Sequence, residues 1–328
     1  MPRPRLSLSA YTDGVLSNNR VVLSQAITLV ESQLAEDQEL AQELLQALLP
    51  HGGRSLRVGI TGVPGVGKST FIEALGLLLN AQQHKVAILT VDPSSQRTGG
   101  SILGDKTRMP RLSQQPLTYI RPSAAGRTVG GVAQRTKETL LLCEAAGYEI
   151  IIVETVGVGQ SETVVHSITD FFLLLMLAGA GDELQGLKKG VTEMADAIAI
   201  NKADGSNQAA ARRAQREYKN ALHLFPPSES HVPPQVFTCS ALHEEGIDTV
   251  WQFIKQYQQT TVANGYFYRN RQQQERQWMH RLVQEHLHQR FYQHPAVQQN
   301  LPSIEQALKE GKITARQAAD TLLSCASG

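Results

Sequence analysis

The sequence of 328 residues contains few cysteines and no apolar run long enough to cross a membrane. Cys143, Cys239 and Cys325 lie far apart and form no Cys-x-x-Cys pair, which argues against a disulfide framework or a structural zinc. The longest apolar stretch, Phe171 to Ala180, is about half of the ~20 residues that a membrane helix needs. The N-terminus carries no apolar segment of signal-peptide length. We therefore expect a soluble cytoplasmic protein.

The chain also lacks an excess of charge of either sign. Its 31 lysines and arginines balance 30 acidic residues, so the formal net charge is +1. No overall attraction to nucleic acid or to anionic lipid follows from this balance, and we expect neither as a partner. Because 41% of the residues are hydrophobic and 19% charged, the composition indicates a sizeable core. The length allows two average domains, or one large domain with appendages.

Residues 20–49 have apolar positions at steps of three and four, which predicts a helix ended by Pro50 and the glycines after it. Between Leu56 and Gln259, short apolar or β-branched runs alternate with helical stretches. This alternation predicts a three-layer α/β fold with a mostly parallel sheet, in which ligands bind at the carboxyl ends of the strands. The expected strands are LRVGIT, KVAILTVD, LTYIRPS, EIIIVET, DFFLLLMLA, DAIAINK and QVFTCSA.

The last part of the chain is expected to be helical. An apolar residue recurs at every fourth position, forming a stripe that either packs on the main domain or pairs with a second copy of the chain. Pro302-Ser303 is expected to open a helix that Gly311 ends, and Thr314 with Gln317 has the spacing of a capping box for the final helix. The stripe residues are Met279, Val283, Leu287 and Phe291.

Gly62-Val63-Pro64-Gly65-Val66-Gly67-Lys68-Ser69 matches the phosphate-binding pattern G-x-x-x-x-G-K-[ST] at every fixed position, and Thr70 follows it. A strand precedes the motif and an amphipathic helix follows, as this loop requires. The glycines let successive N–H groups point at one anion, and the helix N-terminus adds partial positive charge. We expect Lys68 to reach the β- and γ-phosphates and Ser69 to ligate Mg²⁺.

The sequence therefore predicts three parts along the chain. They are an N-terminal helical extension (1–54), a P-loop domain (55–262) and a C-terminal helical appendage (263–328).

Asn201-Lys202-Ala203-Asp204 follows an expected strand and has the N-K-x-D pattern of guanine recognition. A carboxylate accepts hydrogen bonds from guanine N1–H and N2–H₂, which adenine cannot donate. Asp204 is expected to do this, with Asn201 supporting the site and the Lys202 stem lying along the base. Ser240-Ala241-Leu242, after the last expected strand, resembles the loop that offers a backbone N–H to guanine O6. The pattern favours GTP over ATP.

Three acidic residues are candidates to hold Mg²⁺ beside Ser69. Glu154 and Gly157 close the strand EIIIVET, where Glu154 replaces the more common aspartate and the Gly157 N–H would contact the γ-phosphate. Asp92 ends an earlier strand, and Asp105 lies in the loop after it. Because Mg²⁺ keeps several waters, Asp92, Asp105 and Glu154 compete for one or two positions.

Together, GITGVPGVGKST, VDPSSQRTGGSILGDKTRM, ETVGVGQSE, AGAGDELQGLKKGVTEMAD and NKAD resemble the MeaB/ArgK family of P-loop GTPases. The resemblance implies a SIMIBI-class P-loop fold, GTP or GDP and Mg²⁺ as ligands, and a homodimer. It also implies a metallochaperone-like protein that gates adenosylcobalamin loading and protects methylmalonyl-CoA mutase or a related acyl-CoA mutase. The family's catalytic residues map onto Lys68, Asp92, Asp105, Glu154 and Lys188, the last in a segment that relays the nucleotide state to the partner.

The residue after Gly157 is Val158, where other GTPases carry a glutamine that orients the attacking water. We therefore expect slow intrinsic hydrolysis, completed when a partner or a second subunit orders Asp92, Asp105 or Lys188. Two other classes remain open, an ATP-dependent kinase of an amino-acid transport system and a metal-delivery GTPase. Five basic residues near the expected phosphate site could contact phosphate or a partner, or be ordinary surface charges: Arg97, Lys106, Arg108, Arg127 and Arg135.

Overall fold

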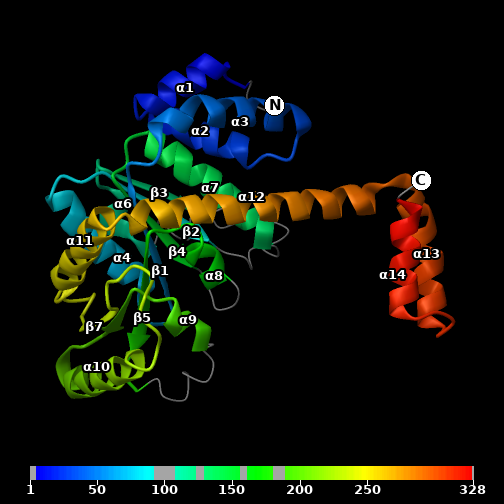
Figure 1. The fold of residues 1–328 in the computed structure, drawn as a ribbon. Helices are drawn as coiled ribbons and strands as arrows, with labels where there is room; N and C mark the ends of the chain where they lie inside the picture. Colours follow the sequence, from blue (N-terminus) through cyan, green and yellow to red (C-terminus); the bar gives the residue numbers. More distant parts are fainter. Residues whose placement is uncertain (1–4, 92–107, 123–128, 156–160, 180–188, 327–328) are drawn as a thin grey trace. The chain divides into compact units, whose positions relative to one another are not determined.

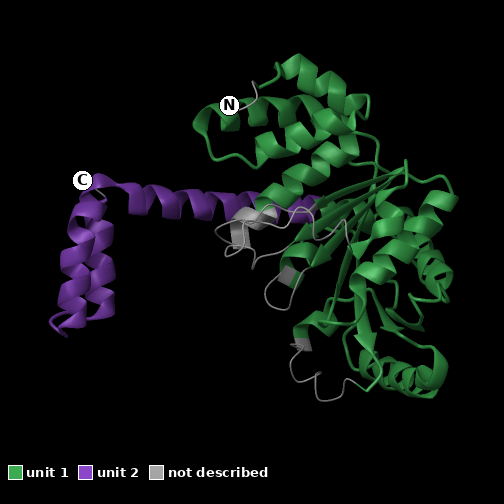
Figure 2. Ribbon diagram, turned by 180° about the vertical axis from the view of Figure 1, so that it is seen from behind, with its two compact units in different colours: residues 1–271 green, residues 272–328 purple. Residues whose placement is uncertain are grey.

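The computed structural model of the chain describes residues 5–91, 108–122, 129–155, 161–179 and 189–326. The chain divides into two compact units, Met1–Arg271 and Gln272–Gly328, shown in Figure 2. The boundary between them falls inside the long helix α12 (Tyr266–Gln293).

The first unit is built around a sheet of seven strands in the order β3-β2-β4-β1-β5-β6-β7. Every adjacent pair of these strands is parallel, so all the carboxyl ends lie at one edge. The seven expected strands are confirmed: β1 (Leu56–Gly62), β2 (Val86–Val91), β3 (Thr118–Pro122), β4 (Ile150–Thr155), β5 (Phe171–Leu177), β6 (Ala197–Asn201) and β7 (Gln235–Thr238).

Helices cover both faces of the sheet, as Figure 1 shows, which confirms the three-layer α/β prediction. Alternate strand residues enter different cores, so Phe172 and Leu174 of β5 lie in one cluster while Phe171 and Leu173 lie in the other. The helices of this unit are α1 (Leu8–Leu16), α2 (Arg20–Val30), α3 (Ala35–Leu48), η1 (Leu49–His51), α4 (Lys68–Ala81), α6 (Pro110–Ser113), α7 (Val129–Ala145), α8 (Ser161–His166), α9 (Lys189–Glu193), η4 (Gly205–Asn207), α10 (Gln208–Leu222) and α11 (Ile247–Ala263).

The single helix expected over residues 20–49 is wrong, because the structure has α2 and α3 with a break between them. After the C-cap residue Glu31, the Ser32 hydroxyl accepts a hydrogen bond from the backbone N–H of Leu34, at 3.3 Å. This turn lets α3 fold back on α2, so both apolar faces are buried in one cluster. Periodicity alone does not reveal such a turn, because the apolar spacing continues through it.

The second unit contains the rest of α12 followed by α13 (Pro295–Lys309) and α14 (Ala315–Cys325). The helix start expected at Pro302 is wrong. Proline 295 begins α13, Pro302 lies inside the helix, and the Ser303 hydroxyl bonds the Asn300 carbonyl instead of a cap position. Gly311, with φ at +70°, follows the end of α13 as expected, and the Thr314–Gln317 capping box is confirmed at the start of α14.

Candidate functional site

The phosphate-binding loop joins the carboxyl end of β1 to α4, which begins at Lys68. Gly65 and Gly67 have φ of +75° and +91°, a region that side chains disfavour. A Cβ on Gly62 would lie 2.4 Å from the Leu175 carbonyl oxygen of the neighbouring strand. The glycines of the motif are therefore required both by backbone rotation and by close packing.

The side chain of Lys68 bends across this loop. Its Nζ donates to the Gly62 carbonyl at 2.8 Å and to the Val63 carbonyl at 3.4 Å. Burial lowers the pKa of Lys68 and the positive charge of Arg108 lowers it further, while Glu154 and Glu162 act in the opposite direction. A half-buried ammonium at the N-terminus of a helix, directly after a glycine-rich loop, suits a polyanion.

The next residue, Ser69, faces the end of β4. Its hydroxyl donates to Glu154 Oε1 at 3.3 Å, and Glu154 is 3% exposed. In the sheet register Glu154 lies opposite Ile60 of β1 and Thr90 of β2, which places its carboxylate beside the P-loop. A hydroxyl and a carboxylate oxygen are the hard ligands that Mg²⁺ prefers.

Asn201 lies at the end of β6 and contacts both the P-loop and the loop that follows β7. Its Nδ2 donates to the Val66 carbonyl of the P-loop at 2.8 Å, and its Oδ1 accepts from the Ala241 N–H at 3.0 Å and from the Cys239 thiol at 3.7 Å. Asn201 is 1% exposed. The side-chain amide of Asn201 therefore holds the P-loop and the loop after β7 together.

Asp204 lies beside the loop that follows β7. The Ser240 hydroxyl donates to Asp204 Oδ2 at 2.5 Å, and Ser240 also pairs with Glu245 through an antiparallel bridge. Lys202 is exposed with φ at +56°, and Leu242 is 75% exposed. The structure thus brings Asn201, Asp204, Ser240 and Ala241 together at the edge of the sheet that carries the P-loop.

Several predicted residues lie outside the described part of the chain. They are Asp92, Asp105, Gly157 and Lys188, together with Val158 and the basic residues Arg97, Lys106 and Arg127.

Three polar residues near the site were not predicted from the sequence. The Thr155 hydroxyl bonds that of Thr61 at 2.8 Å between β4 and β1. Glu162 is 4% exposed, and its negative charge opposes the lowering of the Lys68 pKa by burial. Glu73 lies four residues after Ser69, on the same face of α4, and accepts two backbone hydrogen bonds from α6. Only the spacing of Glu73 from the motif offered a signal in the sequence.

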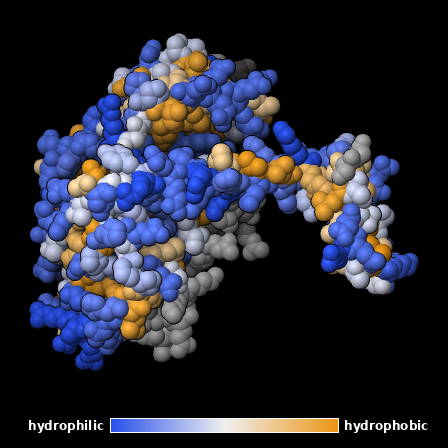
Figure 3. All heavy atoms as spheres, in the orientation of Figure 1, coloured by the Kyte–Doolittle hydropathy of each residue, from blue (hydrophilic) through white to orange (hydrophobic). Residues whose placement is uncertain are grey.

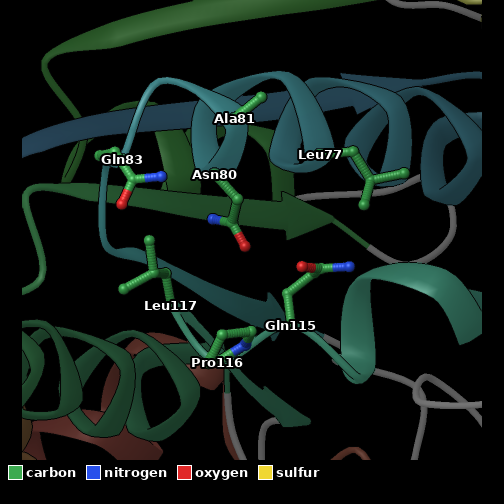
Figure 4. Close-up of a pocket in the computed structure, with 7 residues that line it drawn as sticks. All are labelled: Leu77, Asn80, Ala81, Gln83, Gln115, Pro116 and Leu117. Atoms are coloured by element: carbon green, nitrogen blue, oxygen red, sulfur yellow. The ribbon is translucent and has the colours of Figure 1, made fainter.

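A shallow pocket lies at the opposite, amino-terminal edge of β2 and β3. Figure 4 shows the residues that line it, among them Asn80 and Gln115. The Asn80 amide accepts a hydrogen bond from the Thr118 hydroxyl and donates one to the His84 carbonyl. Within the described residues, no group of three or more His, Cys, Asp or Glu side chains has the arrangement of a metal site. No described helix combines the length and apolar character that crossing a membrane requires.

Comparison with known proteins agrees with this geometry. The family described as methylmalonyl-CoA mutase-associated GTPase MeaB matches residues 23–296. A protein of Caulobacter vibrioides described as a putative GTPase is 49% identical over 321 residues, 98% of each chain. A Mus musculus protein described as a mitochondrial methylmalonic aciduria type A homolog is 45% identical, over 95% of this chain and 78% of its own length. A crystal structure of a LAO/AO transport system kinase, 37% identical, superposes with a TM-score of 0.79 over 98% of each chain. The chain therefore belongs to the MeaB family of methylmalonyl-CoA mutase-associated GTPases.

Proposed function

We propose that this protein binds and hydrolyses GTP and uses that cycle as a chaperone of an adenosylcobalamin-dependent acyl-CoA mutase. The observation that carries the nucleotide part is the position of Asn201, which joins the P-loop to the loop that would receive the base. Asp204, held by Ser240, is left with carboxylate acceptors of the kind that guanine N1–H and N2–H₂ require.

Magnesium is part of the proposal because the donor set fits it. Ser69 Oγ and Glu154 Oε1 lie 3.3 Å apart next to Lys68, and both supply hard oxygens. The ion, when bound, would neutralise charge on the β- and γ-phosphates. Asp92 and Asp105 would complete its surroundings, and Gly157 and Lys188 would respond to the γ-phosphate. Within the described site, Lys68 and the P-loop N–H groups bind and orient the triphosphate.

The mutase is proposed as partner because the family description names methylmalonyl-CoA mutase and the mouse relative's description names methylmalonic aciduria. The chaperone would gate cofactor loading and protect the mutase from inactivation. A cytoplasmic location is proposed with it, since Cys143 and Cys239 are buried free thiols. The test is the rate of GTP hydrolysis with and without purified mutase. An increase of tenfold or more supports the partnership, and equal rates contradict it.

A homodimer is also proposed. The predicted apolar stripe on α12 is largely exposed in the single chain, with Met279, Val283 and Leu287 at 52%, 50% and 61%. Figure 3 shows apolar side chains at the surface along this helix. Pairing with a second copy would remove that surface from water.

Two other functions remain as alternatives, and each has its own test. The relative described as a transport system kinase raises the first. Preference for ATP, or transfer of radiolabelled phosphate to another protein, would support it.

The second alternative is a GTPase that delivers a metal ion to another protein. Metal binding requires a thiolate. Burial raises the pKa of the Cys239 thiol to about 12, and Cys143 is fully buried, so neither thiol readily loses its proton to a metal ion. Stoichiometric nickel or zinc in the purified protein would revive that alternative.

The base is tested by the substitution Asp204→Asn. An amide in place of the carboxylate cannot accept both guanine hydrogen bonds, but its NH₂ can donate to xanthine O2. We expect GTP affinity to fall by about 100-fold, consistent with a charge-assisted hydrogen-bond pair, and XTP affinity to rise. Asp13→Asn, at an exposed position of α1, removes the same charge away from the site and should change neither affinity. An unchanged base preference in Asp204→Asn would contradict the proposal.

A further inference from the structure

We propose that Arg108 is a catalytic residue that this chain supplies to its own triphosphate site, where it contacts the γ-phosphate, and that Glu73 is the positioning residue that holds it there. The proposal rests on the proposed hydrolysis of GTP. It selects one residue from the set of basic side chains that the sequence left undecided.

Hydrogen bonds and apolar contacts attach α6 to α4, the helix that follows the P-loop. Glu73 Oε1 accepts hydrogen bonds from the backbone N–H groups of Arg111, at 2.8 Å, and Leu112, at 3.2 Å. Leu112 packs so closely on α4 that a Cβ on Gly76 would lie 2.4 Å from its Cδ2. Met109 and Leu112 are both fully buried. The short turn that begins just after Arg108 is therefore fixed to the P-loop helix.

The second part is distance along the chain. Glu73 lies one helical turn after Ser69, so the two side chains are neighbours, with Cβ atoms about 5–6 Å apart. Arg108 precedes Arg111 by three residues, which span at most about 11 Å. Arg108 is exposed, and its guanidinium side chain is long enough to extend along α4 towards the P-loop. Consistent with this placement, burial lowers the pKa of Lys68 and the charge of Arg108 adds to that effect.

Lys68 and Arg108 repel each other electrostatically, and both would be attracted to a triphosphate placed between them. During hydrolysis a water oxygen bonds to the γ-phosphorus and the bond to the β–γ bridging oxygen breaks. The electron pair stays on the GDP β-phosphate, and the water proton ends on the released phosphate. Negative charge grows on the bridging and γ oxygens. A guanidinium held against those oxygens stabilises the transition state more than it stabilises bound GDP.

Arg111 provides a matched control on the same turn. Its guanidinium bonds Glu244 at 2.6 Å, and its side chain is 64% exposed. Arg111→Ala therefore removes the same type of side chain from α6 without removing a charge from the P-loop, and its backbone N–H to Glu73 is kept.

The experiment compares Arg108→Ala, Arg108→Lys and Arg111→Ala in the full chain. For Arg108→Ala we expect kcat to fall by about 10³-fold, the low end of the effect of an arginine that contacts the γ-phosphate. The affinity for GDP should stay within twofold, while the affinity for GDP with aluminium fluoride, which imitates the transition state, should fall in parallel with kcat. Arg108→Lys should recover part of the loss, and Arg111→Ala should behave as the wild type.

Glu73 is tested by Glu73→Ala and Glu73→Gln. Glu73→Gln keeps an oxygen that accepts hydrogen bonds from α6, so it should retain most of the affinity for GDP with aluminium fluoride. Glu73→Ala should lose about tenfold in that affinity, while its affinity for GDP alone stays unchanged. Wild-type levels of hydrolysis and of fluoride-complex binding in Arg108→Ala would overturn the proposal, as would equal losses in Arg111→Ala. A wild-type chain that binds neither GDP nor GTP would instead contradict the proposed function itself.

Discussion

At the scale of single residues, Asn201 has the greatest consequence for the site. Its amide uses both of its ends, donating to the P-loop at Val66 and accepting from the base loop at Ala241. An added Cβ on Gly67 would lie 2.9 Å from Asn201 Nδ2, so the phosphate loop also packs directly against this side chain. The loops that would hold the two ends of a nucleotide are therefore kept in register by one buried amide.

We expect Asn201→Ala to weaken GDP binding by about 10²-fold and to reduce the free energy of unfolding by about 2 kcal/mol. The physical reason is that the Ala241 N–H and the Val66 carbonyl are left buried without partners. Asn201→Asp keeps the acceptor for Ala241 but cannot donate to Val66, so it should fall between wild type and alanine when binding is measured by calorimetry. Equal GDP affinity in all three proteins would show that the loops hold their positions without this residue.

The residues that could be predicted from the sequence are those whose type is dictated by local geometry. Gly67 must adopt a positive φ, and Asp204 must present a carboxylate to a base, so each leaves a fixed spacing in the sequence. Thr155 leaves no such spacing, and the spacing of Glu73 from Ser69 shows only that the two share a face of the helix. The fold brings the partners of Glu73 and Thr155 from 38 and 94 residues away. A carboxylate on a helix gives no indication of such a partner until the helix is packed.

At the scale of elements, a buried group of charges attaches the start of β1 to α7 and to the start of α12. Glu144 on α7 accepts from Arg57 at 2.9 and 3.1 Å, from the Ser55 hydroxyl, and from the Gly53 N–H at 2.7 Å. Arg271 on α12 bonds both oxygens of Asp170 and stacks 4.4 Å from the Phe267 ring centre. The linker between the N-terminal helices and the sheet is thereby held by side chains from three elements.

This group predicts a pH dependence. Burial alone would raise the pKa of Glu144, but Arg57 and the hydrogen bonds from Ser55 and Gly53 outweigh it and hold the pKa below the ordinary 4.5. A lowered native pKa contributes stability above the unfolded value and loses it as the pH falls. Wild-type unfolding free energy should therefore decline from about pH 4.5 downward through this group.

Glu144→Gln should remove that part of the decline and lower stability at pH 7 by about 3 kcal/mol, because Arg57 stays buried without its carboxylate. The measurement is urea unfolding between pH 3 and 7. Glu149→Gln, an exposed carboxyl beside His84, serves as control and should change stability by less than about 1 kcal/mol. An identical pH profile in wild type and Glu144→Gln would contradict this account.

Elements differ in how well the sequence predicted them. The strands were predictable because seven apolar runs are too short for helices and are separated by helical stretches. The break between α2 and α3 was not, because Ser32 and Leu34 form a turn whose apolar spacing matches that of the helices around it. Pro302 gave the wrong helix start. A proline is compatible with the first turn of a helix, but Pro295 also fits that position, and it is the one used.

At the scale of the whole molecule, the site and the apolar stripe belong to different compact units. The P-loop, Asn201 and the base loop all lie in Met1–Arg271, and the stripe residues all lie in Gln272–Gly328. The sequence predicted the stripe from its four-residue spacing but left its partner open. Three of the stripe's side chains, Met279, Val283 and Leu287, are at least 50% exposed.

A dimer formed through α12 predicts that charge on the stripe separates the subunits. We expect Val283→Asp or Leu287→Glu to convert the wild-type dimer to a monomer in light scattering, because each places a carboxylate where apolar side chains would pack. Helix content and GDP affinity should stay unchanged, since both residues lie on an exposed face of the second unit. Gln289→Glu adds the same charge on another face of α12 and should remain dimeric. Two results would contradict this prediction: both stripe variants remain dimeric, or the wild-type protein is monomeric at every concentration. Either result would show that the stripe is not part of an interface between copies.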